Sequence, residues 1–180
     1  VRSVEETLPY AGPAEPFIKA WARDMGLREA IALSNVPIYQ ELARRIGPDR
    51  MRAQLTRLDY GNADTGGAVD RFWLDGPLRI SALEQARFMA RLAQGTLPLA
   101  QAAQGAVRDI MRLDQKPGWS LHAKTGWENA PRPGVGWWVG WVEKAGRTYA
   151  FALNLDIRHA ADADKRIPLG KASLAVLGLD

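Results

Sequence analysis

The sequence predicts an α+β fold in which an antiparallel sheet is flanked by helices. Three observations carry this prediction: apolar residues recur at helical spacing through most of residues 15–113, two long apolar runs follow at 135–157, and a last helical pattern covers 167–177. With 180 residues, 47% of them apolar, the chain can bury a sizeable core. We therefore expect a single domain over residues 1–180.

The helical part of the chain divides at recognisable start and stop signals. Residues 1–13 show no period and are expected to form a loop. Ser34 is a good N-cap and Pro37 suits a first helical turn, while Ser81 and Glu84 form a capping box. Helices are accordingly expected at 15–24, at 27–33, from Ser34 to Gly47, at 49–58, from Ser81 towards Gln94 and at 98–113. The glycine-rich segment 62–75 is expected to be a structured loop.

The pattern changes to strands after residue 120. Strands are expected at 120–127, 135–143 and 147–157, and Lys144-Ala145-Gly146 is a hairpin signal between the last two. These runs are apolar on both faces, which is typical of a sheet covered on both sides. The chain is expected to close with a helix at 167–177.

Composition excludes several functional classes. There is no cysteine, so disulfides, cysteine–zinc sites and thiol catalysis are excluded, and the two histidines, His122 and His159, lack metal-ligand spacing. The net charge of +4 is small and scattered, which does not indicate nucleic-acid binding. The sequence contains no run of eighteen apolar residues, so no membrane span is expected. Val1 is not a natural start residue, so we expect the N-terminus to have been removed.

One tripeptide, Lys124-Thr125-Gly126, suggests chemistry. Lysine supplies a positive charge, threonine a hydroxyl donor, and glycine lets a ligand lie against the backbone. Together they predict a strand edge that docks a small anionic ligand through main-chain groups. Taken alone, the tripeptide also fits a simple turn before a strand.

Further motifs stand in one order along the chain. They are Ser34-Asn35-Val36, Tyr60-Gly61-Asn62, Phe72-Trp73-Leu74, Lys124-Thr125-Gly126 and the tryptophan-rich run from Gly136 to Trp141. This ordered set resembles the class D, oxacillinase-type serine β-lactamases, and the resemblance extends from about Leu33 to the end of the chain. It implies the fold shared by serine β-lactamases and penicillin-binding transpeptidases.

The resemblance also implies an activity. The expected function is hydrolysis of penicillin-type β-lactams through an acyl-serine intermediate, which confers antibiotic resistance, in the periplasm. The expected partner is the small-molecule β-lactam, with no nucleic acid and no membrane, and the expected state is a monomer or a homodimer.

The family's Ser-x-x-Lys motif is absent from the sequence. None of the serines has a lysine three residues on; they are Ser3, Ser34, Ser81, Ser120 and Ser173. In the family this serine is the nucleophile, and its lysine, carbamylated by carbon dioxide, is the general base. We therefore expect the chain to be the C-terminal part of such an enzyme, with no cofactor beyond that carbamate and with the missing segment as one further candidate partner.

Residue roles follow from the resemblance. Ser34 would shuttle a proton, although a plain N-cap is the alternative interpretation. Lys124 would supply positive potential, Thr125 and Gly126 would line the substrate strand, and the backbone N–H of Trp127 would donate to the oxyanion.

Other residues would bind two anionic groups, the substrate carboxylate and the lysine carbamate. Arg166 would bind the substrate carboxylate, with Lys165 as a one-residue alternative and a solvated surface arginine as the plain one. Trp73 would donate its indole N–H to the carbamate, and Val36 and Leu74 would line that pocket. Tyr60 and Asn62 are interpreted as mostly structural, and tryptophans 137, 138 and 141 as sheet core.

Three rival functions stay open at this stage. A β-lactam sensor domain shares the motifs but stays acylated, and an upstream membrane helix would favour it. A penicillin-binding transpeptidase typically has Ser-x-Asn, whereas Val36 stands at that third position. A non-catalytic remnant would explain the absent motif directly.

Overall fold

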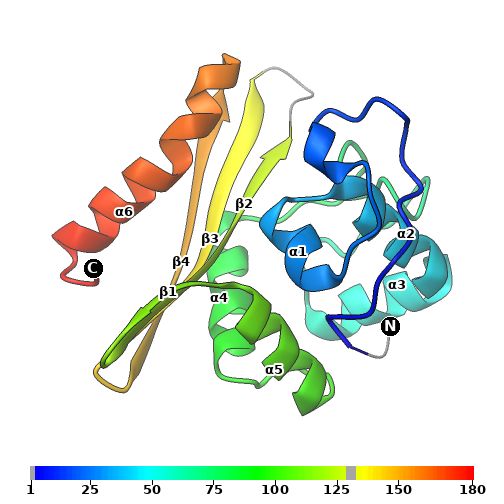
Figure 1. Ribbon diagram of the computed structural model, residues 1–180. Helices are drawn as coiled ribbons and strands as arrows, with labels where there is room; N and C mark the ends of the chain where they lie inside the picture. The colour runs from blue at the N-terminus through cyan, green and yellow to red at the C-terminus, as the bar shows by residue number, and fades with distance from the viewer. Residues whose placement is uncertain (1–2, 129–132) are drawn as a thin grey trace. The chain divides into compact units, whose positions relative to one another are not determined.

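The structure is a computed structural model that describes residues 3–128 and 133–180 (Figure 1). The chain forms two compact units, of which the first comprises Val1–Arg79 with Ala100–Met111, and the second comprises Ile80–Leu99 with Arg112–Asp180. The chain therefore passes from one unit to the other three times. The single domain expected from the sequence stays a prediction.

The first unit is helical. Its elements are η1 (Lys19–Trp21), α1 (Leu27–Ala32), α2 (Val36–Ile46), α3 (Pro48–Leu58) and α5 (Gln101–Ile110). Leu8, Met25, Ala30 and Ile38 form a buried cluster in this unit. Leu8 and Met25 also exchange two backbone hydrogen bonds, of 3.0 and 3.2 Å, which attach the N-terminal segment to this cluster.

The prediction of a helix at residues 15–24 is wrong, because only the short 3-10 helix η1 forms there. Groups in this segment bind partners outside it. The indole N–H of Trp21 donates to the Leu33 carbonyl at 2.9 Å, and the Asp24 carboxylate accepts from the Tyr10 N–H at 2.8 Å. Tertiary contacts therefore override the local helical pattern.

The N-cap of α2 is Asn35 and not Ser34. The Asn35 side-chain oxygen accepts a hydrogen bond from the Ile38 N–H at 3.3 Å, one turn into the helix. Ser34 instead has a left-handed backbone, with φ of 52°. An asparagine caps a helix as well as a serine does, so the sequence pattern allowed either residue.

The second unit contains the sheet. Its elements are α4 (Ala82–Ala93), β1 (Arg112–Lys116), β2 (Trp119–Glu128), β3 (Gly134–Lys144), β4 (Arg147–Ile157), η2 (Ala160–Lys165) and α6 (Arg166–Val176). The four strands are antiparallel in the order β1-β2-β3-β4, which agrees with the α+β prediction (Figure 1). The expected capping box is present, since Ser81 and Glu84 bind each other's backbone N–H groups at 3.2 and 2.8 Å.

Strand β1 was not predicted. The helix expected at 98–113 is too long, because α5 ends at Ile110 and β1 begins at Arg112. All five residues of β1 are exposed and four are polar, so the strand has no apolar alternation. Pairing with β2 holds this segment as a strand, and a pairing partner cannot be read from local sequence.

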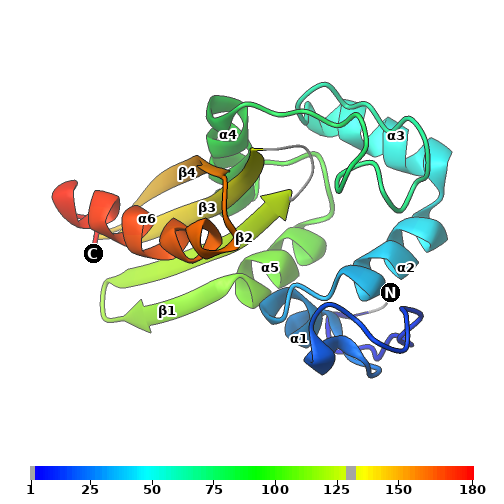
Figure 2. The same cartoon turned by 90° about the horizontal axis from the view of Figure 1, so that it is seen from above.

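Helices cover both faces of the sheet, as expected. Figures 1 and 2 show α6 on one face and α4 on the other. The buried cluster beneath α6 consists of Leu121, Ala123, Trp138, Val142, Leu174 and Leu179. The β3–β4 turn uses Ala145 and Gly146, both at positive φ, which suits the right-handed twist of a hairpin.

Helix α6 approaches the sheet at a glycine. A Cβ atom built on Gly170 would overlap the ring of Trp138, a residue that is fully buried in β3. By contrast, Gly105 lies in α5, and a Cβ there would meet nothing within 4 Å. The two helical glycines therefore have opposite structural roles.

We predict opposite effects for the same substitution at these positions. Gly170→Ala should lower the free energy of unfolding by roughly 1–3 kcal/mol, because the extra methyl overpacks the core. Gly105→Ala should raise it by about 0.5–1 kcal/mol, because alanine favours the helix. Urea denaturation of both variants checks this. Unchanged stability in Gly170→Ala would show that α6 packs farther from Trp138.

Candidate active site

The candidate site residues predicted from the sequence occur in both units. Those on strand β2, from Lys124 to Trp127, lie in the second unit. The Lys124 ammonium donates to the carbonyl of Thr125 at 3.0 Å and to its hydroxyl at 3.3 Å. Lys124 and Thr125 are both half-buried in β2. These two contacts hold the lysine against the threonine that follows it.

The electrostatics of Lys124 are unusual. Burial, together with the nearby positive charge of Arg166, lowers the pKa of its ammonium from 10.5 to about 8. A lysine with such a pKa exists in both charged and neutral forms near neutral pH. It can therefore provide positive potential and also exchange a proton.

Arg166 is the first residue of α6, and its side chain reaches β2. Its Nε donates to the Ala163 carbonyl at 2.6 Å, and its Nη1 donates to the Gly126 carbonyl. Among residues 3–128 and 133–180, no protein acceptor binds its Nη2. Burial lowers the pKa of this guanidinium, but an arginine stays charged. Its remaining donors can meet a planar carboxylate.

Lys165, the neighbouring alternative, has another partner. Its ammonium binds the Asp162 carboxylate at 2.7 Å, and 62% of its side chain is exposed. The hydrogen bond from Lys165, with those from the backbone N–H groups of His159 and Arg158, lowers the pKa of Asp162 to about 2. The structure therefore places Arg166, and not Lys165, against the strand that carries the Lys-Thr-Gly motif.

Gly126 and Trp127 continue the strand. Gly126 pairs with Trp137 and Trp127 pairs with Gly136 across β3, and Trp127 is 36% exposed. A Cβ on Gly126 would come within 3.3 Å of Trp137. Lys124, Thr125, Gly126 and Arg166 are thus brought together by direct contacts in the second unit.

In the first unit, Ser34 occupies the junction of α1 and α2. Its left-handed backbone is held because its N–H donates to the Ile31 carbonyl at 3.2 Å, and the N–H of Asn35 donates to Ala30 at 2.8 Å. The fully buried Asn35 amide also donates to the Trp21 carbonyl at 3.2 Å. A non-glycine residue held in this conformation is often functional.

Val36 and the Trp73-Leu74 pair belong to the same unit. Val36 is the half-buried first residue of α2. Trp73 and Leu74 lie in turns. The ring centroids of Trp73 and Phe72 are 5.0 Å apart in an edge-to-face arrangement, and the Leu74 N–H donates to the Arg71 carbonyl at 2.8 Å. Within the described part of the chain, the indole N–H of Trp73 has no protein acceptor.

Tyr60 and Asn62 lie at and just after the end of α3. The Tyr60 N–H donates to Leu55 at 3.1 Å, at the end of α3. The Asn62 amide donates to the Pro77 carbonyl at 2.9 Å, and its side-chain oxygen accepts from the Arg79 N–H at 2.9 Å. Asn62 therefore joins two loop segments of the first unit.

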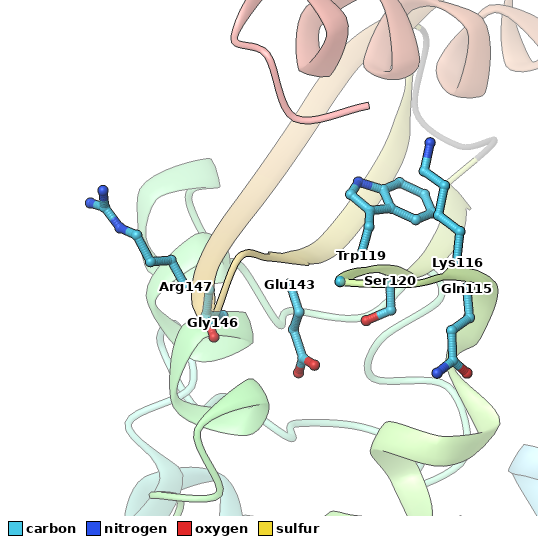
Figure 3. A pocket seen from close by; sticks show the side chains of 9 residues that line it. Gln115, Lys116, Trp119, Ser120, Glu143, Gly146 and Arg147 are labelled. Carbon is cyan, nitrogen blue, oxygen red and sulfur yellow. The ribbon is translucent and has the colours of Figure 1, made fainter.

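A polar cluster at the other end of β2 was missed. The Ser120 hydroxyl and the His122 ring nitrogen lie 3.2 Å apart, and His122 stacks on Trp141 at 4.6 Å. Nearby, Gln115, Lys116, Trp119, Ser120, Glu143 and Arg147 line an open hollow of about 430 Å³ (Figure 3). The spacing of Ser120, His122 and Lys124 on one face of a strand was the available signal.

Neither unit shows a metal site or a membrane helix among its described residues. No three acidic or histidine side chains there gather closely enough to hold a metal ion. Nor does the described chain contain a helix with the length and apolar content needed to cross a bilayer.

Comparisons with known proteins agree on one family. Residues 4–175 match the model of the penicillin-binding protein transpeptidase domain. The chain is 42% identical over 158 residues to beta-lactamase OXA-5 of Pseudomonas aeruginosa and 44% identical over 140 residues to beta-lactamase OXA-48 of Klebsiella pneumoniae. These alignments cover 86% and 78% of this chain, but 58% and 53% of the relatives. The chain thus spans little more than half their length.

Solved structures give the same result. The class D beta-lactamase YbXI from Nostoc has a TM-score of 0.95 at 38% identity, covering 100% of this chain and 76% of that one. FUS-1 (OXA-85), a class D beta-lactamase from Fusobacterium nucleatum subsp. polymorphum, has a TM-score of 0.95 at 39% identity, covering 99% of this chain and 74% of that one.

The pKa of Lys124 predicts a pH effect on stability. Between about pH 8 and its ordinary pKa of 10.5, the unfolded chain binds a proton that the folded chain has released. Stability should therefore rise as the pH increases from 8 to 10, and this rise should be smaller in Lys124→Met. The range stops at pH 10 because burial raises the pKa of Tyr39 to about 12, which gives the opposite slope above pH 10.

Urea denaturation across this range measures the slope, and ¹³C NMR of the lysine side chains gives the titration midpoint directly. An identical slope in Lys124→Met, together with a midpoint above pH 10, would contradict the prediction.

Proposed function

The chain belongs to the class D β-lactamases of the penicillin-binding transpeptidase family, and on this premise we propose that its protein hydrolyses penicillin-type β-lactams through an acyl-serine intermediate. The observation that carries the proposal is the Arg166 guanidinium bonded to Gly126, beside the Lys124 and Thr125 side chains. Two cations and a hydroxyl at a strand edge suit the carboxylate of a small anionic substrate.

The second unit would bind and polarise the substrate. Arg166 and Thr125 would hold the carboxylate, since guanidinium and hydroxyl groups both donate to it. The N–H of Trp127 would donate to the oxygen that becomes negative in the tetrahedral intermediate. Lys124, with its pKa near 8, would add positive potential and take part in proton transfer.

The first unit would contribute the proton relay and the carbamate pocket. Ser34 would pass protons through its hydroxyl, and its fixed left-handed backbone supports a directed side chain. The Trp73 indole N–H, which lacks a protein acceptor in the described chain, suits an anionic group. Val36 and Leu74 supply half-buried apolar surface for the walls of such a pocket.

The nucleophile must come from a Ser-x-x-Lys sequence that these 180 residues do not contain. We propose that its lysine carries carbon dioxide as a carbamate, which supplies a general base. No other cofactor is proposed. For the whole protein we further propose the periplasm as its location and a monomer or homodimer as its state.

A complementation experiment tests this function. The 180 residues alone should neither gain mass stoichiometrically with ampicillin nor hydrolyse nitrocefin, because they lack the nucleophile. Joined to the N-terminal segment of a class D relative that carries Ser-x-x-Lys, they should do both. Intact-mass spectrometry and absorbance read the two outcomes.

Two results would count against the proposal. A stoichiometric adduct on the 180 residues alone would identify Ser34 or Ser120 as an unexpected nucleophile. A joined protein that folds, as judged by circular dichroism, but leaves nitrocefin intact would refute hydrolysis as the function.

Trp73 provides a separate prediction for the joined protein. Trp73→Phe keeps the aromatic bulk but removes a charge-assisted hydrogen bond worth on the order of 1.5–3 kcal/mol. The variant should lose carbamate, deacylate slowly and recover partly with added bicarbonate. ¹³C NMR with labelled bicarbonate reads the carbamate independently of activity. A full carbamate signal in Trp73→Phe would reduce Trp73 to a packing residue.

A further inference from the structure

Gly136 is buried in the interior of β3, and its backbone does not require a glycine. It is not among the glycines with positive φ, so other residues could adopt its conformation. A glycine inside a strand weakens the strand and often marks the close approach of another group. The question is which group needs the space beside Gly136.

Two side chains lie where a Cβ atom would point. That atom would come 2.7 Å from Cδ1 and 3.0 Å from Cγ1 of Ile157, and 3.0 Å from Cδ of Arg166. Both distances are closer than normal packing, so a methyl group at residue 136 must displace at least one neighbour. Gly136 pairs with Trp127 on β2. Trp127 directly follows Gly126, whose carbonyl accepts a hydrogen bond from the Arg166 guanidinium.

The aliphatic stem of Arg166 has little freedom to move. It begins at the first residue of α6, its Nε is bound to the Ala163 carbonyl at 2.6 Å, and its Nη1 is bound to the Gly126 carbonyl. A shift of its Cδ would therefore break at least one of these hydrogen bonds. Ile157 is also buried, but its two close atoms, Cγ1 and Cδ1, lie on one branch of a side chain that can change rotamer without breaking a hydrogen bond.

We propose that Gly136 is a positioning residue for Arg166: its missing side chain leaves the space through which the arginine stem crosses β3 to reach Gly126. The location of the guanidinium then depends on a residue that makes no hydrogen bond to it. The consequence for a substrate carboxylate rests on the proposed function, but the positioning itself does not.

The test uses the 180-residue chain without any β-lactam. The Nε–H of Arg166 should give a slowly exchanging ¹⁵N NMR signal, which Arg166→Ala identifies by its loss. In Gly136→Ala this signal should move and exchange at least about tenfold faster, because the bond to Ala163 opens. The titration midpoint of Lys124 should rise in Gly136→Ala, and it should also rise in Arg166→Ala, which removes the neighbouring charge.

A matched pair of double variants separates the two neighbours. Arg166→Ala should recover most of the melting temperature lost in Gly136→Ala, because it removes the colliding stem. Ile157→Ala, which removes both Cγ1 and Cδ1, should recover less when compared with Ile157→Ala alone, and should leave the Arg166 signal displaced. This comparison also applies if Gly136→Ala alone fails to fold.

Two outcomes would overturn the proposal. In the first, Gly136→Ala keeps the protected Arg166 signal and the wild-type Lys124 midpoint. In the second, adding Ile157→Ala to Gly136→Ala restores the melting temperature of Ile157→Ala alone, which would assign the space to the isoleucine. Both outcomes are read from NMR signals and melting temperatures, not from enzyme activity. The test therefore stays valid even if the protein does not hydrolyse β-lactams.

Discussion

The antiparallel pairing of β2 with β3 is the interaction on which the candidate strand site depends. Its register sets Gly126 opposite Trp137 and Trp127 opposite Gly136, and it directs the Trp138 indole towards α6. Because Gly170 lets α6 pack directly on that indole, the first residue of the helix can reach back to β2. Arg166 is therefore placed by backbone pairing and core packing rather than by a charged partner.

The parts of the fold that local pattern controls were predicted well. The strand expected at 147–157 has the bounds of β4, because an apolar run and a turn at positive φ define it. The capping box before α4 and the cover on both faces of the sheet were also confirmed. The failures, η1 and β1, are segments whose structure depends on partners distant in sequence.

The candidate site divides in a similar way. Short motifs, such as a lysine followed by a threonine and a glycine or the Phe72-Trp73 pair, can be identified from the sequence as candidate site residues. The sequence favoured Arg166 and left Lys165 as an alternative, because both are cations; their contacts, with Gly126 and with Asp162 respectively, are visible only in the structure. The importance of Gly136, Gly170 and Asn35 was equally hidden, since it resides in which atoms pack against them.

The interleaving of the two units has a consequence during synthesis. The first unit includes Ala100–Met111, so it cannot be completed until α5 has left the ribosome. By then α4 has already emerged, while the strands that it covers, β3 and β4, are still to be made. The apolar side chains of α4, among them Met89 and Leu92, must therefore wait without their sheet. During this interval the exposed apolar surface of α4 favours aggregation of the nascent chain.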